Sequence, residues 1–323
     1  MDVALKILTV QGSASTTDIE RFYDKEKNTL KEMRDLNHPH LIRAVAAYQR
    51  GYSRCFIFPW AEGGDLRSLW RKDATRLDGN LILWALGQME GITGGILELH
   101  RKKMRHGDLK PENILRFMST RAPDDLGTLV VADVGLTKYH PEYTRERNIA
   151  TTTRHGSRMY EPPDVLTTNP TSRRYDVWSL GCVFLEFVIW LLYGYGGPFG
   201  LRALHEELVK DASIDRFWKN DPVTGLQVHP VVLDWIENKL LKEIPAGCPL
   251  RDLVSYIGSK LLLQVNERPY SKDVHNELKE IEKSWTAHNF ESCCSRFAQE
   301  RNRRLASEGL IDDPAVHLSK QVR

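Results

Sequence analysis

The chain has 323 residues, of which 41% are hydrophobic and 27% are charged. This is an ordinary globular mixture, long enough for one two-lobed domain or two small domains with a sizeable core. Lysine and arginine number 45 and aspartate and glutamate 43. The resulting net charge of +2 gives no electrostatic reason to expect nucleic acid or a membrane as the main partner.

The five cysteines have neither disulfide nor zinc-ligand spacing. We interpret them as reduced thiols of an intracellular protein, cytoplasmic or nuclear, although the adjacent Cys293 and Cys294 leave a redox site open. The first residues lack the pattern of a signal peptide. The most apolar run, Cys182–Tyr193, contains Glu186 and is shorter than the about 20 residues that span a bilayer. It indicates a buried core helix.

The first part of the chain is rich in predicted strands. Alternation over Val3–Leu8 predicts a strand with Ala4 and Lys6 on one face. A capping box at residues 17–20 predicts a helix, and Glu26 lies at the centre of its apolar stripe. Two further strands are predicted over residues 41–48 and 55–60.

After Gly63-Gly64 the pattern becomes helical. Short strands are predicted at residues 114–115 and 129–132, and helices over residues 65–72, 81–103, 177–193, 201–210, 229–242, 250–263 and 271–286. We therefore expect a strand-rich lobe over residues 1–64, a helical lobe over residues 65–286, and a polar, peripheral tail over residues 287–323. The predicted fold is α+β, with a hinge between two lobes and a cleft suited to a ligand.

Several short motifs occur in a fixed order. In the segment His106–Leu115 (HGDLKPENIL), an aspartate precedes an asparagine by five residues on a loop before a strand. Asp133-Val134-Gly135 directly follows a predicted strand. The other motifs are VALK at residues 3–6, GSRMYEPPD at 156–164, DVWSLG at 176–181 and Arg268-Pro269. Together they resemble the eukaryotic protein kinase superfamily.

The resemblance covers residues 3–269 and implies a two-lobed serine/threonine protein kinase, similar to kinases of filamentous fungi. It implies ATP and Mg²⁺ as cofactors and proteins with Ser/Thr hydroxyls as substrates. No Gly-x-Gly-x-x-Gly occurs in the strand-rich part, so that lobe is expected to be truncated. The glycine-rich loop is expected upstream of Met1, in a segment lost from the sequence or absent from a shortened product. The activity of the chain without that loop stays open.

The resemblance assigns the catalytic roles residue by residue. Asp108 would accept the proton of the substrate hydroxyl, and Lys110 would stabilise the transferring phosphate. Asn113 and Asp133 would coordinate Mg²⁺, which prefers oxygen ligands. Lys6 would hold the α- and β-phosphates.

The partner of that lysine is expected to be Glu26, although the family spacing counted back from His38-Pro39 points to Thr29 instead. The nucleotide would be bound by the gatekeeper Phe58, by the hinge residues and by residues on either side of the base. These further contacts are the adenine-binding Pro59 and Ala61, the ribose-binding Asp65, and Ala4 and Leu115 above and below the base.

The resemblance also implies supporting contacts. Asp176 should accept hydrogen bonds from the catalytic-loop backbone, and Asp164 and Arg268 should form a buried ion pair. Ser157 should contact the catalytic aspartate. Gly107 stands where the family has an arginine that pairs with an activating phosphate, so we expect activity independent of such phosphorylation.

Two other functions compete with protein phosphorylation. Small-molecule phosphotransferases also use His-Gly-Asp, a downstream asparagine and a metal-binding aspartate, but they lack the motifs around Asp164, Asp176 and Arg268. A pseudokinase acting as a scaffold is the other alternative. The intact Lys6 and Asp108 argue against it, whereas the missing glycine-rich loop argues for it.

Overall fold

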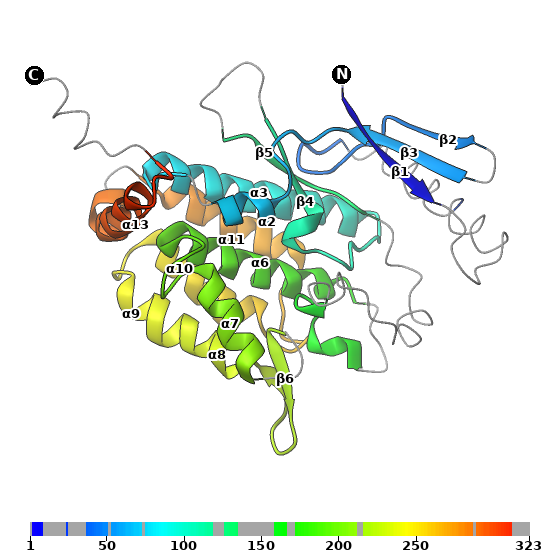
Figure 1. Ribbon diagram of the computed structural model, residues 1–323. Coiled ribbons are helices and arrows are strands. Elements are labelled where there is room, and N and C mark those ends of the chain that lie inside the picture. The colour runs from blue at the N-terminus through cyan, green and yellow to red at the C-terminus, as the bar shows by residue number, and fades with distance from the viewer. Residues whose placement is uncertain are drawn as a thin grey trace, which may run out of the picture.

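The computed structural model (Figure 1) contains two lobes, one a small sheet and the other mainly helical. The predicted helix near Thr17, with Glu26, and the expected contact residue Ser157 lie outside the described residues. The structure describes residues 2–8, 24, 37–50, 53–72, 75–118, 126–134, 158–166, 172–211, 216–286 and 289–311.

A three-stranded antiparallel sheet forms one end of the molecule (Figure 1). Its order is β1-β3-β2, and its strands are β1 (Val3–Leu8), β2 (Ala46–Arg50) and β3 (Ser53–Pro59). Along β1, Ala4 and Lys6 are half-buried, whereas Val3, Leu5 and Ile7 are exposed. The predicted alternation of β1 is therefore confirmed, with its apolar side chains facing away from the rest of the protein.

The predicted strand over residues 41–48 is only partly correct. Residues 46–48 belong to β2, but residues 40–42 pair with β5 (Thr128–Val131) of the helical lobe. The N–H of Ile42 donates to the carbonyl of Val131 and the N–H of Val131 to that of His40, both at 2.9 Å. This segment thus connects the two lobes.

Gly63 and Gly64 form the second connection. The N–H of Gly63 donates to the carbonyl of Arg116 at 3.0 Å, and the N–H of Arg116 to the carbonyl of Gly64 at 2.7 Å. A Cβ on Gly63 would lie 2.7 Å from that Arg116 oxygen, and the φ of Gly64 is +72°. Both positions favour glycine, one for close backbone approach and one for its left-handed conformation. The hinge predicted from the change of pattern lies here.

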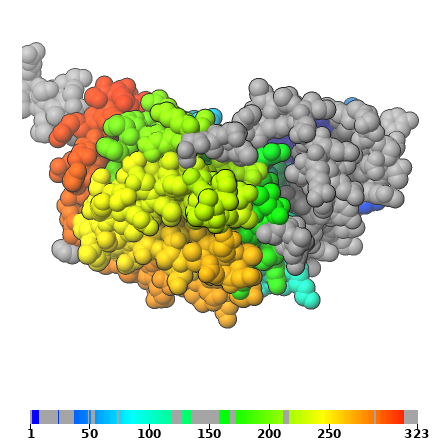
Figure 2. Space-filling view, turned by 90° about the horizontal axis from the view of Figure 1, so that it is seen from below, coloured from blue at the N-terminus to red at the C-terminus, as the bar shows by residue number. Residues whose placement is uncertain are grey.

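The helical lobe is built around α3 (Gly79–Arg101) and α6 (Arg174–Tyr193). Asp78 begins α3 by accepting a hydrogen bond from the N–H of Leu81 at 2.8 Å, as an N-cap residue does. α3 packs against α6 and α11 (Ser271–Ser284), and α6 also contacts α13 (Ser295–Ser307). Figure 2 shows residues of about 225–285, in yellow and orange, forming one face of this lobe.

The other elements are shorter. In the described residues, the further helices are α2 (Leu66–Lys72), α7 (Leu201–Asp211), α8 (Pro230–Asp234), α9 (Leu241–Glu243) and α10 (Pro249–Tyr256), and the further strands are β4 (Ile114–Phe117), β6 (Trp218–Asp221) and β7 (Gly225–Val228). Single turns of 3₁₀ or π helix are η1 (Pro111–Asn113), η3 (Pro163–Leu166), η4 (Trp235–Leu240), η5 (Ile257–Leu261) and η6 (Phe290–Cys294). The predicted helix over residues 229–242 is the continuous run α8–η4–α9.

Among the described residues, α6 is the one helix whose length and composition would suit a membrane span. Its 20 residues are apolar enough for that test, but the whole apolar stretch is buried inside the fold. Core helices of globular proteins share this composition. The predicted core helix is therefore confirmed.

The C-terminal segment differs from the peripheral tail that we expected. Residues 289–311 include η6 and α13, and Cys294, Phe297 and Ala298 belong to the hydrophobic core. The side chain of Asn302 also exchanges hydrogen bonds with the backbone of Leu77, at 2.8 and 2.9 Å. The segment reads as polar because α13 buries one face only, comprising Phe297, Ala298, Arg301 and Leu305.

Candidate active site

Asp176, the third residue of α6, holds the loop that carries Asp108. Asp176 is fully buried and accepts hydrogen bonds from the N–H of His106 at 2.8 Å and the N–H of Gly107 at 2.7 Å. The ring of His106 donates to the carbonyl of Ala132 at 2.8 Å. The predicted contact between Asp176 and the loop backbone is confirmed, and it joins the loop to the strand end before Asp133.

Asp176 stays charged despite its burial. Burial alone raises the pKa of a carboxyl group, but the hydrogen bond and charge of His100, together with the loop N–H groups, hold the pKa of Asp176 below its ordinary value. The Nε2 of His100 lies 2.9 Å from the Asp176 carboxylate, and its Nδ1 lies 2.8 Å from the hydroxyl of Ser271. The loop N–H groups therefore donate to a charged carboxylate, which His100 of α3 and Ser271 of α11 help to keep in place.

Asp108, Lys110 and Asn113 form one cluster at the end of this loop. The Nζ of Lys110 lies 2.9 Å from the Asp108 carboxylate. The Nδ2 of Asn113 donates to the backbone carbonyl of Asp108 at 2.7 Å and to its carboxylate at 3.1 Å. The Asp108 side chain is one-third exposed, so its carboxylate is oriented by two neighbours while remaining reachable by a substrate hydroxyl.

Asp133 follows β5 closely, and its neighbour Ala132 donates its N–H to the carbonyl of Asn113 at 2.8 Å. Its backbone has φ = +58°, an uncommon conformation outside glycine. Its carboxylate lies 2.9 Å from the Nζ of Lys6 on β1, with side chains 43% and 26% exposed, respectively. The structure therefore brings Lys6 and Asp133 together across the two lobes. Glu26, the expected partner of Lys6, lies outside the described residues, so that pairing stays a prediction.

The residues proposed to hold Mg²⁺ fit a hard cation. The amide N of Asn113 is used by Asp108, which leaves its Oδ1 for a cation, and Asp133 offers an exposed carboxylate. Within the described ranges, no three His, Cys, Asp or Glu side chains are grouped so as to hold a metal alone. Mg²⁺ commonly takes one or two protein carboxylates and completes its shell with water and phosphate, so Asp133 and Asn113 would be sufficient protein ligands.

The predicted nucleotide contacts lie along the hinge, on both lobes. Ala4 of β1 pairs with Phe58 of β3, and Pro59 ends β3. Asp65 forms a bridge with Leu115 on the helical lobe. The further predicted contact, Ala61, lies between these two pairs and accepts the N–H of Gly64 at 3.1 Å.

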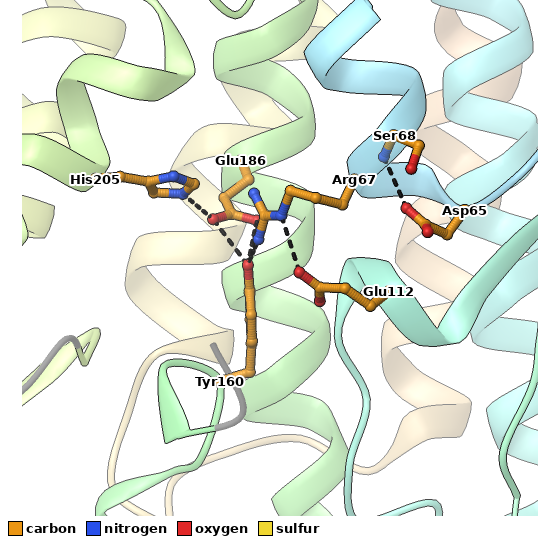
Figure 3. Close-up of polar contacts among 7 residues, drawn as sticks. All are labelled: Asp65, Arg67, Ser68, Glu112, Tyr160, Glu186 and His205. Atoms are coloured by element: carbon orange, nitrogen blue, oxygen red, sulfur yellow. Dashed lines mark hydrogen bonds and ion pairs between the residues drawn. The ribbon is translucent and has the colours of Figure 1, made fainter. Parts of the chain in front are cut away.

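Asp65 also has a structural task. One of its carboxylate oxygens accepts the N–H of Ser68 at 2.7 Å and caps α2 (Figure 3). Its second oxygen is the one left for the predicted ribose contact.

The last predicted contact fixes the end of the segment 158–166. Arg268 donates two hydrogen bonds of 2.7 Å to the carboxylate of Asp164, and both side chains are almost fully buried. Arg268 also donates to the carbonyls of Leu263 and Arg174. The predicted buried ion pair is confirmed.

Comparison with known families agrees with this arrangement. The protein kinase domain model matches residues 1–193, which is more than half of the chain. The chain belongs to the protein kinase domain family.

The kinase domain has similarity to curated serine/threonine kinases. It is 28% identical to serine/threonine-protein kinase PKH3 of Eremothecium gossypii over 224 residues, 68% of this chain and 29% of that protein. It is 30% identical to serine/threonine-protein kinase Sgk1 of Homo sapiens over 191 residues, 59% of this chain and 39% of that protein. The matched region spans less than half the length of either relative.

The kinase domain also contains a buried polar network that the motifs did not predict (Figure 3). Arg67 of α2 donates to Glu112, which precedes Asn113, at 3.2 Å, and to the hydroxyl of Tyr160 and the carboxylate of Glu186. Tyr160 donates to Glu186 at 2.8 Å, and His205 of α7 lies 2.5 Å from the same carboxylate. The network connects Glu112 of the catalytic loop, Tyr160 of the segment 158–166, α2, α6 and α7.

Charge compensation explains why this network tolerates burial. Burial raises the pKa of a carboxyl group, but the charge of Arg67 and the contact with His205 hold the pKa of Glu186 below its ordinary value. Burial also raises the pKa of Tyr160 well above its usual range, so its hydroxyl stays a donor. One signal was present in the sequence: a glutamate in the middle of an apolar helix requires a buried partner.

Proposed function

We propose that this kinase domain transfers the γ-phosphoryl group of ATP, with Mg²⁺, to Ser/Thr hydroxyls of protein substrates. The observation that carries the proposal is the 2.9 Å contact between Lys6 and Asp133 across the lobes. The neighbour of Asp133, Ala132, donates its N–H to the carbonyl of Asn113 at 2.8 Å, which connects this pair to the cluster of Asp108, Lys110 and Asn113. A cation for phosphates, oxygen ligands for a metal and a carboxylate for a hydroxyl thus meet at one place. Phosphoryl transfer requires this combination, because its catalysis consists mostly of positioning and charge neutralisation.

Lys6 and Asp133 hold the phosphate end of the site. Their ion pair is partly exposed, so separating the two charges costs about 0–1 kcal/mol. A bound nucleotide can therefore take Lys6 for its phosphates while Asp133 and the Oδ1 of Asn113 turn to a cation. When bound, Mg-ATP supplies the phosphoryl group and neutralises part of its charge.

Asp108 acts on the acceptor. Asn113 and Lys110 fix its carboxylate from two sides, which leaves it oriented to accept a hydrogen bond and then a proton from a substrate hydroxyl. Lys110 forms an ion pair with the same carboxylate and is placed to stabilise negative charge that develops on the transferred phosphoryl group.

A protein acceptor is favoured by the segment 158–166. Asp164 and Tyr160 anchor this segment to the helical lobe through Arg268 and Glu186. Glu161 of this segment lies near enough to Asp108 for their charges to interact, so a peptide chain bound along the segment would reach Asp108. A panel that contains Ser/Thr peptides, an aminoglycoside and choline separates this proposal from small-molecule phosphotransfer.

The test pairs a binding measurement with a rate measurement. Mg-ATP should raise the melting temperature of the chain, and Asp133→Asn should remove this shift. Asp108→Asn should keep the shift but lower kcat by about 10²–10⁴-fold, because it removes the proton acceptor. Asp252→Asn, an exposed change on α10, serves as the matched control.

Two results would count against the proposal. If Mg-ATP does not stabilise the wild-type chain, the scaffold alternative takes its place. If Asp108→Asn retains the wild-type kcat, the transfer chemistry is not centred on this loop.

A further inference from the structure

Arg67 of α2 lies between two acidic side chains of the helical lobe (Figure 3). Its Nε donates to the carboxylate of Glu112 at 3.2 Å, and its Nη2 donates to the hydroxyl of Tyr160 and, at 3.4 Å, to the carboxylate of Glu186. The Arg67 side chain is 8% exposed. One buried guanidinium therefore connects the turn η1 with the segment 158–166 and with α6.

The second carboxylate is not required for charge balance. Glu186 is fully buried and already faces the charge of Arg67, and the hydroxyl of Tyr160 at 2.8 Å and the ring of His205 at 2.5 Å also contact it. The Glu112 side chain is 39% exposed, so water could solvate it without any partner. Ion pairs with such an exposed member contribute little to stability. The contact between Arg67 and Glu112 therefore points to a role other than stability.

Glu112 directly precedes Asn113 in a single 3₁₀ turn. Pro111 begins this turn with a fixed φ, and the N–H of Asn113 closes it on the carbonyl of Lys110 at 2.9 Å. The side-chain amide of Asn113 donates to Asp108, which leaves its Oδ1 for a cation. Because the turn is one short unit, a contact that holds Glu112 also limits how the turn, and with it Asn113, can rotate.

Arg67 is itself held in place by α2. This helix packs against η1 and β4, and the carboxylate of Asp65 caps it at the N–H of Ser68. The Arg67 guanidinium lies 5.4 Å from the ring centroid of Trp70, one turn further along the helix. Since α2 begins directly after the hinge, Arg67 connects the hinge to the turn that carries Asn113.

We propose that Arg67 is a positioning residue for the candidate active site, because through Glu112 it holds η1 in the orientation in which Asn113 offers its Oδ1 to Mg²⁺. This inference rests on the proposed phosphoryl transfer. Loss of a side chain that orients a metal ligand typically lowers metal affinity or activity by about 10–100-fold. Glu112 acts from one residue away, so the expected effect is at the lower end, about 10-fold.

The experiment follows binding rather than turnover. The melting temperature of the full chain is measured at a fixed, saturating ATP concentration while Mg²⁺ is titrated, and the midpoint of the Mg²⁺-dependent shift is compared between variants. The binding of Mg²⁺ by ATP itself is the same in every sample, so a difference belongs to the protein. Glu112→Ala should raise the midpoint about 10-fold. Glu112→Gln keeps an oxygen that can accept from the Nε of Arg67, so its midpoint should lie closer to that of the wild type.

Tyr160→Phe is the matched control from the same network. It removes the hydroxyl that contacts Arg67 and Glu186, but it keeps the ring and leaves the contact between Arg67 and Glu112 in place. It should lower the melting temperature without nucleotide and keep the wild-type Mg²⁺ midpoint. If the network served only to stabilise the fold, Glu112→Ala and Tyr160→Phe would have the same Mg²⁺ midpoint.

Arg67→Met tests the arginine directly. Because this change alone leaves Glu186 buried without its cation, it is combined with Glu186→Gln, and Glu186→Gln alone is the reference. The Mg²⁺ midpoint should rise about 10-fold against that reference. Adding Glu112→Ala should raise it no further, since Arg67 acts through Glu112. If the combined variant does not fold, the comparison of Glu112→Ala with Tyr160→Phe decides.

Three results would overturn the inference. A wild-type Mg²⁺ midpoint in Glu112→Ala would do so while the proposed function stands, and a raised KM for a peptide in that variant would then make Glu112 a substrate contact. Additive effects of the changes at Arg67 and Glu112 would show that the two residues act separately. A wild-type chain that shows no shift with Mg-ATP would overturn this inference together with the proposed function.

Discussion

At the scale of single residues, burial decides how much an ion pair contributes. Asp164 and Arg268 are almost fully buried, and Arg268 further donates to two backbone carbonyls. Its guanidinium also lies 5.1 Å from the ring centroid of Trp178. Arg296 and Glu300 on α13 form a pair whose side chains are 72% and 61% exposed. Both are arginine–carboxylate pairs, but the first is buried in the protein and the second is exposed to solvent.

We expect Asp164→Ala to lower the free energy of unfolding by about 3–5 kcal/mol, because it leaves Arg268 buried without its counter-charge. Glu300→Ala should change it by less than about 1 kcal/mol. Urea denaturation of both variants measures the difference. The double change Asp164→Ala with Arg268→Met should recover part of the loss, and a loss equal to the sum of the two single changes would show that the residues do not interact.

At the scale of elements, the hinge depends on one close approach. Gly63 lies against the backbone of Arg116 in β4, with no room for a methyl group. Gly79, at the start of α3, offers a matched contrast, since its nearest neighbour would lie 3.6 Å from an added Cβ.

Gly63→Ala should destabilise the chain by about 1–3 kcal/mol, since the hinge or β4 must move to fit the methyl group. It should also weaken Mg-ATP binding, because the predicted adenine contacts Pro59 and Ala61 lie beside it. Gly79→Ala should be neutral or slightly stabilising. Thermal melts with and without Mg-ATP test both variants. Equal melting temperatures and equal Mg-ATP shifts for the two variants would show that the close approach at Gly63 is not needed for the hinge.

The elements also show how far sequence patterns reach. Motifs predicted the Asp176 contact and the Asp164–Arg268 pair, because each is specified by residues at fixed places in a motif. Arg67 was not predicted, because an arginine on a short helix normally faces water and nothing local marks its partners Tyr160 and Glu186. The alternation over residues 41–48 does not reveal that residues 40–42 pair with β5 instead.

At the scale of the whole molecule, buried carboxylates link stability to pH. The folded-state pKa values of Glu186 and Asp176 lie below their ordinary values of 4.5 and 3.8. A depressed pKa contributes stability above the unfolded pKa and loses it as pH falls toward the folded pKa. Glu161 opposes this, because burial raises its pKa.

The melting temperature should therefore fall as pH drops from about 5 to about 3. Glu186→Gln should cost stability at pH 7, and the gap between this variant and the wild type should narrow over the same range. Melting curves at matched ionic strength test this. A gap that stays constant down to pH 3 would mean that Glu186 is protonated, or that its charge adds nothing.

The burial of α6 has a consequence for the order of synthesis. The helix ends at residue 193, where the family match also ends, but α10, α11 and α13, which pack on it, are made later. While a ribosome extends the chain, α6 emerges as an apolar segment before the helices that cover it have been made. The helical lobe can close only after α13 has been made, so a nascent chain halted at residue 193 should depend on chaperones that a chain extending through α13 does not require.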